Sequence, residues 1–177
     1  MEIENVIGLD SQCLSYLIDA MQGVAEPSGD LAAEKVALFR TYLYTPDTLF
    51  VTRTVVDECA RIRDVQRREL HDSYIGVLFG EWQLQDEQSI RSRAKDLESH
   101  HRGKFDCRIL AEAEEARFSA LLSFDGQFVT HLSELTIGVQ LTHPSSYWVK
   151  IGICIGAKPD KIPHSTNPLA NEDWWRW

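Results

Sequence analysis

The sequence predicts an α/β fold with a mainly parallel central sheet. Short apolar stretches of strand length alternate with longer stretches whose apolar residues recur at helical spacing. This alternation favours β-α-β units, because parallel strands need crossover connections that cover both faces of the sheet with helices. With 177 residues, the chain is long enough to bury a core in one domain without disulfide bonds.

The first half of the chain predicts two strands and four helices. The predicted strands cover residues 3–9 and 48–52, and the predicted helices cover residues 13–21, 31–44, 54–63 and 66–78. Asp10 and Ser11 are typical of a helix cap before the first helix, and Asp30 is a candidate cap for the second. The sequence Thr45-Pro46 is expected to end the second helix.

The second half predicts three helices, three strands and a tail. The predicted helices cover residues 86–100, 105–118 and 127–134, and the predicted strands cover residues 120–124, 139–142 and 148–155. We expect a main domain over residues 1–157 and a tail over 158–177. The tail contains three prolines and ends in Trp174, Trp175, Arg176 and Trp177. These tryptophans either pack back onto the sheet, which we favour, or stack on bases or a partner.

Several function classes are disfavoured by composition. No apolar stretch is long enough to cross a bilayer, and no secretory signal is evident, so we expect a cytoplasmic protein without a membrane association. The four cysteines, at positions 13, 59, 107 and 154, lack the close pairs of a zinc site and are expected to be reduced and packed.

A net charge of −9 counts against binding to nucleic acid, because phosphate contacts need Lys and Arg. The basic residues, however, are grouped in two places. One group lies between Arg53 and Arg68 and the other between Arg91 and Lys104. Arg53, Arg61 and Arg68 are candidate contacts to an RNA backbone, and a solvated helix face is the alternative. His100 and His101 lie in a charged segment and are expected at the surface.

Four acidic residues fall where an open parallel sheet places its sites, beyond the carboxyl ends of the strands. Asp10 and Asp125 follow predicted strands, and Glu58 and Asp106 lie in the first turns of predicted helices. Each also fits a plainer interpretation. Asp10 and Asp106 suit helix caps or first turns, Asp125 with Gly126 suits a turn, and Glu58 suits a solvated helix face.

Taken together, the four acidic segments resemble the motifs of the PIN-domain family. They are residues 7–11 (IGLDS), 55–58 (VVDE), 106–113 (DCRILAEA) and 122–128 (LSFDGQF). The last two, joined by an alanine-rich helix, are the most specific, and the resemblance covers roughly residues 3–145. It implies a three-layer α/β/α sandwich fold. It also implies the activity of a Mg²⁺- or Mn²⁺-dependent endoribonuclease, which is a hydrolase. Family members include toxins of toxin–antitoxin pairs and RNA-processing nucleases.

By position, Asp10, Glu58, Asp106 and Asp125 match the metal-binding and catalytic acids of that family. Ser123 matches its polar position before the last acid, and Ser11 is a second supporting hydroxyl. Oxygen ligands suit Mg²⁺ or Mn²⁺, which would polarise the phosphate and activate a water. We assign Asp10 and Asp106 as direct ligands and expect Glu58 and Asp125 to hold metal-bound waters or a second ion.

The resemblance also implies partners, and it leaves alternatives open. The implied partners are single-stranded or structured RNA, an antitoxin protein and a second copy in a homodimer. Glu112 and Asp57 are competing acids, and residues beyond about 145 match no part of the family that we can name. The alternative function is a PIN-like binding or regulatory module without nuclease activity. A phosphatase with an Asp nucleophile is disfavoured, because Gln12 stands where such enzymes need a second Asp.

Overall fold

The fold is built on a five-stranded sheet in which all strand pairs are parallel. The computed structural model describes residues 5–23, 25–81, 83 and 86–177. The strands are β1 (Ile7–Leu9), β2 (Leu49–Val51), β3 (Gly80–Glu81), β4 (Ala120–Leu122) and β5 (Gln140–Thr142), in the order β3-β2-β1-β4-β5. The predicted α/β class with a parallel sheet is therefore confirmed, and the arrangement is compatible with PIN-like folds.

The strand order places β1 at the centre, with β2 on one side and β4 on the other. Leu9 pairs with both Val51 of β2 and Leu122 of β4, so the three strands end at the same level. The chain turns from β1 toward β2 and from β4 toward β5, in opposite directions. Such a switch point opens a crevice beyond the carboxyl ends of the two central strands, where ligands of open α/β sheets bind. Asp10 and Asp125 follow these two strands.

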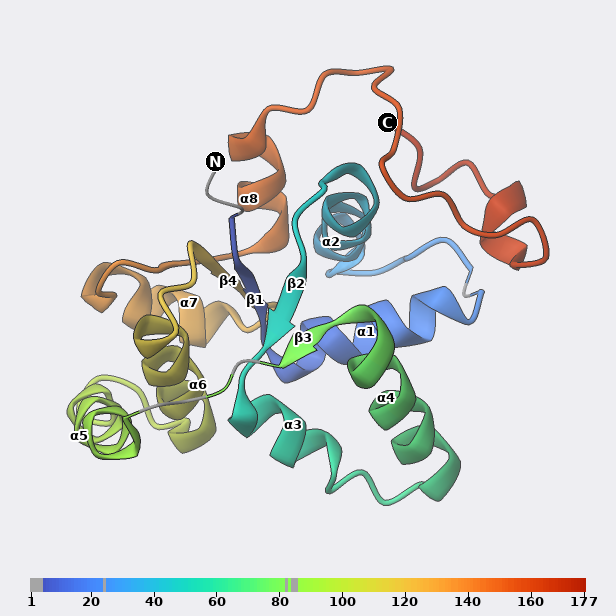
Figure 1. Ribbon diagram of the computed structural model, residues 1–177. Coiled ribbons are helices and arrows are strands. Elements are labelled where there is room, and N and C mark those ends of the chain that lie inside the picture. The colour runs from blue at the N-terminus through green and yellow to red at the C-terminus, as the bar shows by residue number, and fades with distance from the viewer. Residues whose placement is uncertain (1–4, 24, 82, 84–85) are drawn as a thin grey trace.

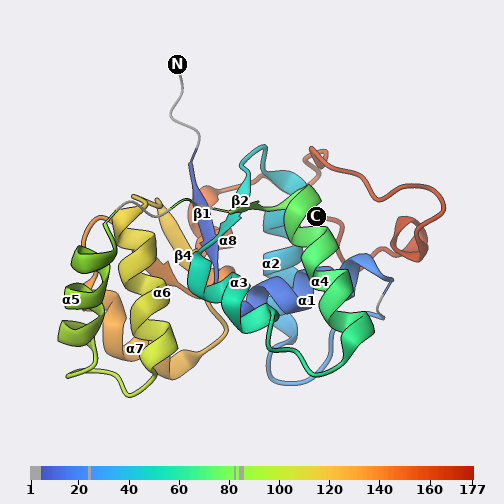
Figure 2. The same ribbon diagram turned by 60° about the horizontal axis from the view of Figure 1, so that its bottom comes forward.

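Helices cover both faces of the sheet, as Figures 1 and 2 show. One side carries α1 (Ser11–Met21), α2 (Ala32–Tyr44) and α4 (Val65–Leu78), and the other carries α5 (Glu87–Leu97), α6 (Lys104–Glu115) and α7 (Gly126–Leu132). Helix α3 (Arg53–Cys59) lies at the end toward which the strands run. Fully buried residues of β1, β4, α1 and α6 form the core, for example Leu9, Leu122, Leu17 and Leu110.

Most predicted elements are present, with shifted ends. The predicted strand over 3–9 begins only at Ile7 within the described residues, since residues 3 and 4 lie outside them. The predicted helix over 54–63 ends at Cys59. The predicted cap at Asp30 is wrong: Leu31 occupies the cap position of α2 and makes no side-chain capping hydrogen bond. The short strand β3 was not predicted.

The predicted strand over residues 148–155 is wrong, because this region forms helix α8 (Pro144–Ile151). Pro144 occupies the first helical turn, where its missing N–H costs nothing. Tyr147 and Trp148 are buried while Val149 is exposed, which is a helical rather than a strand pattern. Gly152, with φ of 65°, ends the helix in the left-handed conformation.

The C-terminal segment packs against the body of the molecule, on α2 and α8. The side chain of Trp175 is fully buried, and its indole N–H donates to the carbonyl of Leu169 at 2.8 Å. Arg40 of α2 donates to three consecutive main-chain carbonyls, of Trp174, Trp175 and Arg176. The ring of Trp177 meets that of Trp148 edge to face. The tryptophans therefore pack inward, as favoured, although their contacts are with helices.

No helix within the described part of the chain is long and apolar enough to span a membrane. Of the four cysteines, Cys13, Cys59 and Cys107 are buried and Cys154 is exposed, and all four are free thiols.

Candidate functional site

Asp10 lies at the carboxyl end of the central strand β1, at the switch point of the sheet. It follows β1 directly and caps α1, accepting a hydrogen bond from the backbone N–H of Cys13 at 2.7 Å through Oδ1. Its side chain also hydrogen-bonds that of Ser123, and the residue is only 5% exposed. Burial is the main reason why the pKa of Asp10 rises from its ordinary value of 3.8 to about 6, and the charge of Asp106 adds to the rise.

Asp125 lies beside Asp10, after the neighbouring strand β4. Its Oδ1 accepts from the backbone N–H groups of Gln127 at 2.8 Å and Phe128 at 3.1 Å, so Asp125 caps α7. Its own N–H donates to the hydroxyl of Ser123 at 3.0 Å. Ser123, which is fully buried, therefore connects Asp10 to Asp125. The predicted cap at Asp10 is confirmed, whereas Asp125, for which only a turn was predicted, also caps a helix. Both caps are made through Oδ1.

Glu58 reaches the same end of the sheet from α3. It is half-buried, and the hydroxyl of Ser11 donates a hydrogen bond to its Oε2. The pKa of Glu58 is raised, first by burial and also by the charge of Asp106, while the hydrogen bond from Ser11 and the charge of Arg61 oppose the rise. Glu58 is thus not simply a residue on a solvated helix face.

Asp106 interacts electrostatically with two of the other acids, Asp10 and Glu58. It lies in the first turn of α6, where Gly103 rather than Asp106 holds the cap position. Its negative charge raises the pKa of both Asp10 and Glu58, although these two residues come from different elements. We call Asp10, Glu58, Asp106 and Asp125 the acidic site. Within the described residues, no Lys or Arg forms an ion pair with any of the four.

A histidine pair beside Asp106 was missed by the sequence analysis. His101 is only 6% exposed, so its predicted surface position is wrong, whereas His100 is exposed. The Nε2 of His101 lies 2.8 Å from Oδ2 of Asp106, and its Nδ1 lies 3.3 Å from Nδ1 of His131. Its ring stacks on that of Phe128 at 5.7 Å between centroids. No local signal predicts this burial, because α7 supplies both Phe128 and His131.

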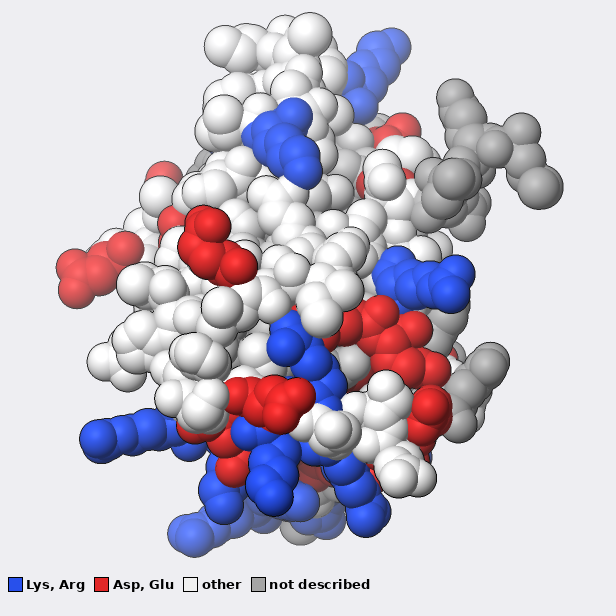
Figure 3. Space-filling model, turned by 90° about the vertical axis from the view of Figure 1, so that its left-hand side faces the viewer, with Lys and Arg blue, Asp and Glu red and all other residues white. Residues whose placement is uncertain are grey.

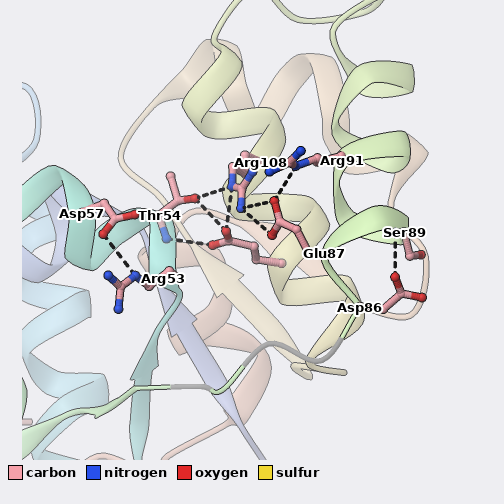
Figure 4. Close-up of polar contacts among 9 residues, drawn as sticks. Arg53, Thr54, Asp57, Asp86, Glu87, Ser89, Arg91 and Arg108 are labelled. Atoms are coloured by element: carbon pink, nitrogen blue, oxygen red, sulfur yellow. Dashed lines mark hydrogen bonds and ion pairs between the residues drawn. The ribbon is translucent and has the colours of Figure 1, made fainter.

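The competing acid Glu112 has a structural role. It is fully buried, and its carboxylate accepts from the backbone N–H of Thr54 at 2.9 Å, the hydroxyl of Thr54 at 2.8 Å and Nε of Arg108 at 3.0 Å. Arg108 also binds Glu87 of α5 (Figure 4). We call these four residues the Glu112 network. It ties the start of α3 to α6 and α5, and thereby holds the helix that carries Glu58.

The other competing acid, Asp57, is half-exposed and pairs with Arg53 at 3.1 Å (Figure 4). Arg53 also pairs with Glu81, so this arginine already has two acidic partners. Arg68 donates to the carbonyl of Ile62 at 3.1 Å. Arg61 lies over the half-exposed ring of Phe105, at 5.0 Å from its centroid, next in sequence to Asp106. Of the three candidate RNA contacts, Arg61 therefore lies nearest the acidic site.

The charge on the surface is unevenly distributed, despite the net charge of −9. On the face that carries α5, α6 and α7, Lys and Arg side chains gather at the lower end, toward which the strands run (Figure 3). The upper part of this face carries few charges. These Lys and Arg side chains, which lie among Asp and Glu side chains in the same view, are therefore at the same end of the molecule as the acidic site, and we call it the basic end.

The donor set fits a hard divalent cation that keeps much of its water. Among the residues that the structure describes, no three His, Cys, Asp or Glu side chains come close enough to form a complete metal cage. Mg²⁺ is commonly bound through one or two carboxylates, waters and substrate phosphates rather than by such a cage. The coupled carboxylates of Asp10 and Asp106 meet this smaller requirement. Buried Thr52, which follows the residue paired with Leu9, adds a hydroxyl without a partner in the described region.

A scan against protein-family models finds no match to the chain, and a search of curated proteins finds none either.

Proposed function

We propose that the chain is a Mg²⁺- or Mn²⁺-dependent endoribonuclease of the PIN-domain type that hydrolyses RNA phosphodiester bonds. The observation that carries the proposal is the acidic site itself. Four carboxylates from four separate elements lie toward the carboxyl ends of the central strands, and the charge of Asp106 raises the pKa of Asp10 and of Glu58. None of the four forms an ion pair with a Lys or Arg of the described chain. Such an arrangement is costly for the protein alone and becomes favourable with a bound cation.

Asp10 and Asp106 are the proposed direct ligands. Glu58 and Asp125 would accept hydrogen bonds from the waters that complete the coordination, or hold a second ion. When bound, the ion would polarise the phosphate and lower the pKa of an attacking water. Ser11 and Ser123 orient Glu58 and Asp10 through the hydrogen bonds described above. His101 holds Oδ2 of Asp106, which leaves Oδ1 for the ion.

RNA would approach across the basic end of the molecule. Arg61 and the exposed ring of Phe105 flank Asp106 and suit contact with a phosphate and a base of single-stranded RNA. Arg53 and Arg68 have protein partners and would make weaker contacts. Pairing with an antitoxin protein and formation of a homodimer remain predictions from the family resemblance.

The second candidate function is a PIN-like binding or regulatory module without nuclease activity. One observation favours it: no complete cage of three ligands is assembled by the described residues, and Asp106 already binds His101. In that case the acids would stabilise helix starts, and the basic surface would serve binding alone.

Cleavage of a fluorescent single-stranded RNA separates the two candidates. We expect cleavage in Mg²⁺ or Mn²⁺ that stops with excess EDTA. Asp106→Asn should lower the rate by more than about a hundredfold, since changes to residues that merely support a ligand cost 10–100-fold. Asp57→Asn, at the half-exposed acid next to Glu58, should cleave at the parent rate. It is purified in the same way, so it controls for a contaminating nuclease. Cleavage that persists in chelator, or that is equal in Asp106→Asn and the parent, would refute the metal-dependent mechanism.

A further inference from the structure

A pocket of about 650 Å³ opens beside Asp106 and Asp125, between the loop of residues 98–103 and the first turns of α7. Its volume is within the range of small-molecule sites. We propose that this pocket binds one ribonucleotide of the RNA chain, next to the phosphate that is cleaved. The inference rests on the proposed function, because it is the shared wall of Asp106 and Asp125 that places the pocket beside the reacting phosphate.

The lining of the pocket selects a polar ligand. Every lining residue is charged, polar or glycine, and none carries an aliphatic side chain. Pockets for apolar ligands are instead lined mainly by hydrophobic residues. Acceptors are supplied by Glu98 and Ser99, and donors by Arg102 and Gln127. A ribonucleotide uses both, since its phosphate accepts hydrogen bonds and its 2′-hydroxyl donates and accepts them.

Arg102 provides a guanidinium that is available for a phosphate. It is exposed, and its side chain makes no hydrogen bond or ion pair with any described residue. The neighbouring arginines differ: Arg93 is bound to Glu114, and Arg108 to Glu87 and Glu112. All five N–H donors of Arg102 therefore remain for a planar, bidentate contact with a phosphate.

The opposite wall offers an aromatic face and an amide. The exposed ring of His131 meets His101 edge to face at 5.5 Å, and His101 is fixed by Asp106 and by its stack on Phe128. Imidazole rings are among the side chains on which unpaired RNA bases stack. The side-chain amide of Gln127 has no partner in the described chain, and an amide pairs with a base edge in both directions. One pocket is thus lined by a hydrogen-bond donor for a phosphate (Arg102), a ring for base stacking (His131) and an amide that can contact a base edge (Gln127).

Titration of the full-length protein with the four ribonucleoside 5′-monophosphates in Mg²⁺ tests this assignment. We expect at least one nucleotide to bind, and Arg102→Gln and His131→Ala each to weaken it by about tenfold, as for a lost charged contact or base stack. Gln127→Ala should change the order of preference among the four bases. Arg117→Gln, at an exposed arginine beyond the far end of α6, is the matched control and should bind like the parent. Thermal melting of each variant checks that it is folded.

Several outcomes separate this assignment from the nuclease proposal. If the parent cleaves RNA and the three pocket variants cleave with the parent's KM and sequence preference, the pocket assignment is wrong while the nuclease proposal stands. If nucleotides bind in a manner sensitive to Arg102 but RNA is not cleaved in Mg²⁺ or Mn²⁺, the pocket stands and the nuclease fails. Inorganic phosphate that competes as strongly as the nucleotides would reduce the pocket to an anion site and overturn the assignment.

Discussion

Asp10 and Glu112 are both buried carboxylates, yet their surroundings differ in kind. Glu112 receives three hydrogen bonds, one of them from the cation Arg108. Among the described residues, Asp10 receives hydrogen bonds only from the neutral donors of Cys13 and Ser123, and it faces the like charge of Asp106. Burial of a carboxylate is tolerated when its charge is paired and is costly when it is not. The Glu112 network therefore stabilises the fold, whereas the acidic site is strained in a way that a cation would relieve.

The largest expected effect is on the Glu112 side of this comparison. Glu112→Ala should lower the free energy of unfolding by about 3–5 kcal/mol, because it removes the buried carboxylate that accepts from both donors of Thr54 and from Nε of Arg108. Chemical denaturation in the absence of metal measures this loss. Asp57→Ala, which breaks an exposed ion pair with Arg53, should cost less than about 1 kcal/mol. A loss at Glu112 no greater than that at Asp57 would contradict the structural role of the network.

The carboxylate of Asp10, in contrast to that of Glu112, should destabilise the metal-free native state when it is ionised. Folding raises the pKa of Asp10 from 3.8 to about 6, so between these values the native state binds more protons than the unfolded state. The metal-free parent should therefore lose stability as pH rises from about 4 to about 7, by about 3 kcal/mol for a shift of about two units. Asp10→Asn lacks this contribution and should equal or exceed the parent's stability at pH 7.

Denaturation curves at several pH values with EDTA present make this comparison. A parent that gains stability over that pH range relative to Asp10→Asn would show that ionised Asp10 is favourably paired in the native state. The acidic site would then resemble the Glu112 network, and the strain inferred from its surroundings would be absent.

A smaller effect is expected from the backbone that holds Asp106. A Cβ at Gly103 would overlap Oδ2 of Asp106 and lie 2.6 Å from Nε2 of His101. Gly103→Ala should thus displace this carboxylate and lower metal-dependent RNA cleavage by about 10–100-fold. Gly126→Ala is the matched control, because its Cβ would meet no atom within 4 Å although it adjoins Asp125. Equal cleavage rates of the two variants would argue against a requirement for the position of Asp106.

The same two carboxylates show which features of the site can be predicted from the sequence and which cannot. The strands before Asp10 and Asp125 are apolar runs, which are local signals, and both strands were predicted, with shifted ends. The cap at Asp10 was also predicted, but the cap at Asp125 was not. The distinction between Glu112 and Asp106 could not be predicted, because it depends on partners outside α6: Thr54 for Glu112 and His101 for Asp106. Likewise, helix α8 was mistaken for a strand because its apolar residues are nearly continuous, and only burial against α2 distinguishes its two faces.

Metal binding by Asp10 and Asp106 is tested most directly by the thermal shift that Mn²⁺ produces in the parent and in variants of the acidic site. We expect Mn²⁺ to stabilise the parent, by roughly 2.7 kcal/mol at a hundredfold excess over the dissociation constant. Asp10→Asn and Asp106→Asn should gain much less, while the control Asp57→Asn should gain as much as the parent. Asn also caps helices well, so capping alone predicts no such difference. Equal Mn²⁺-induced shifts in all four proteins would show that Asp10 and Asp106 are not metal ligands and would contradict the account.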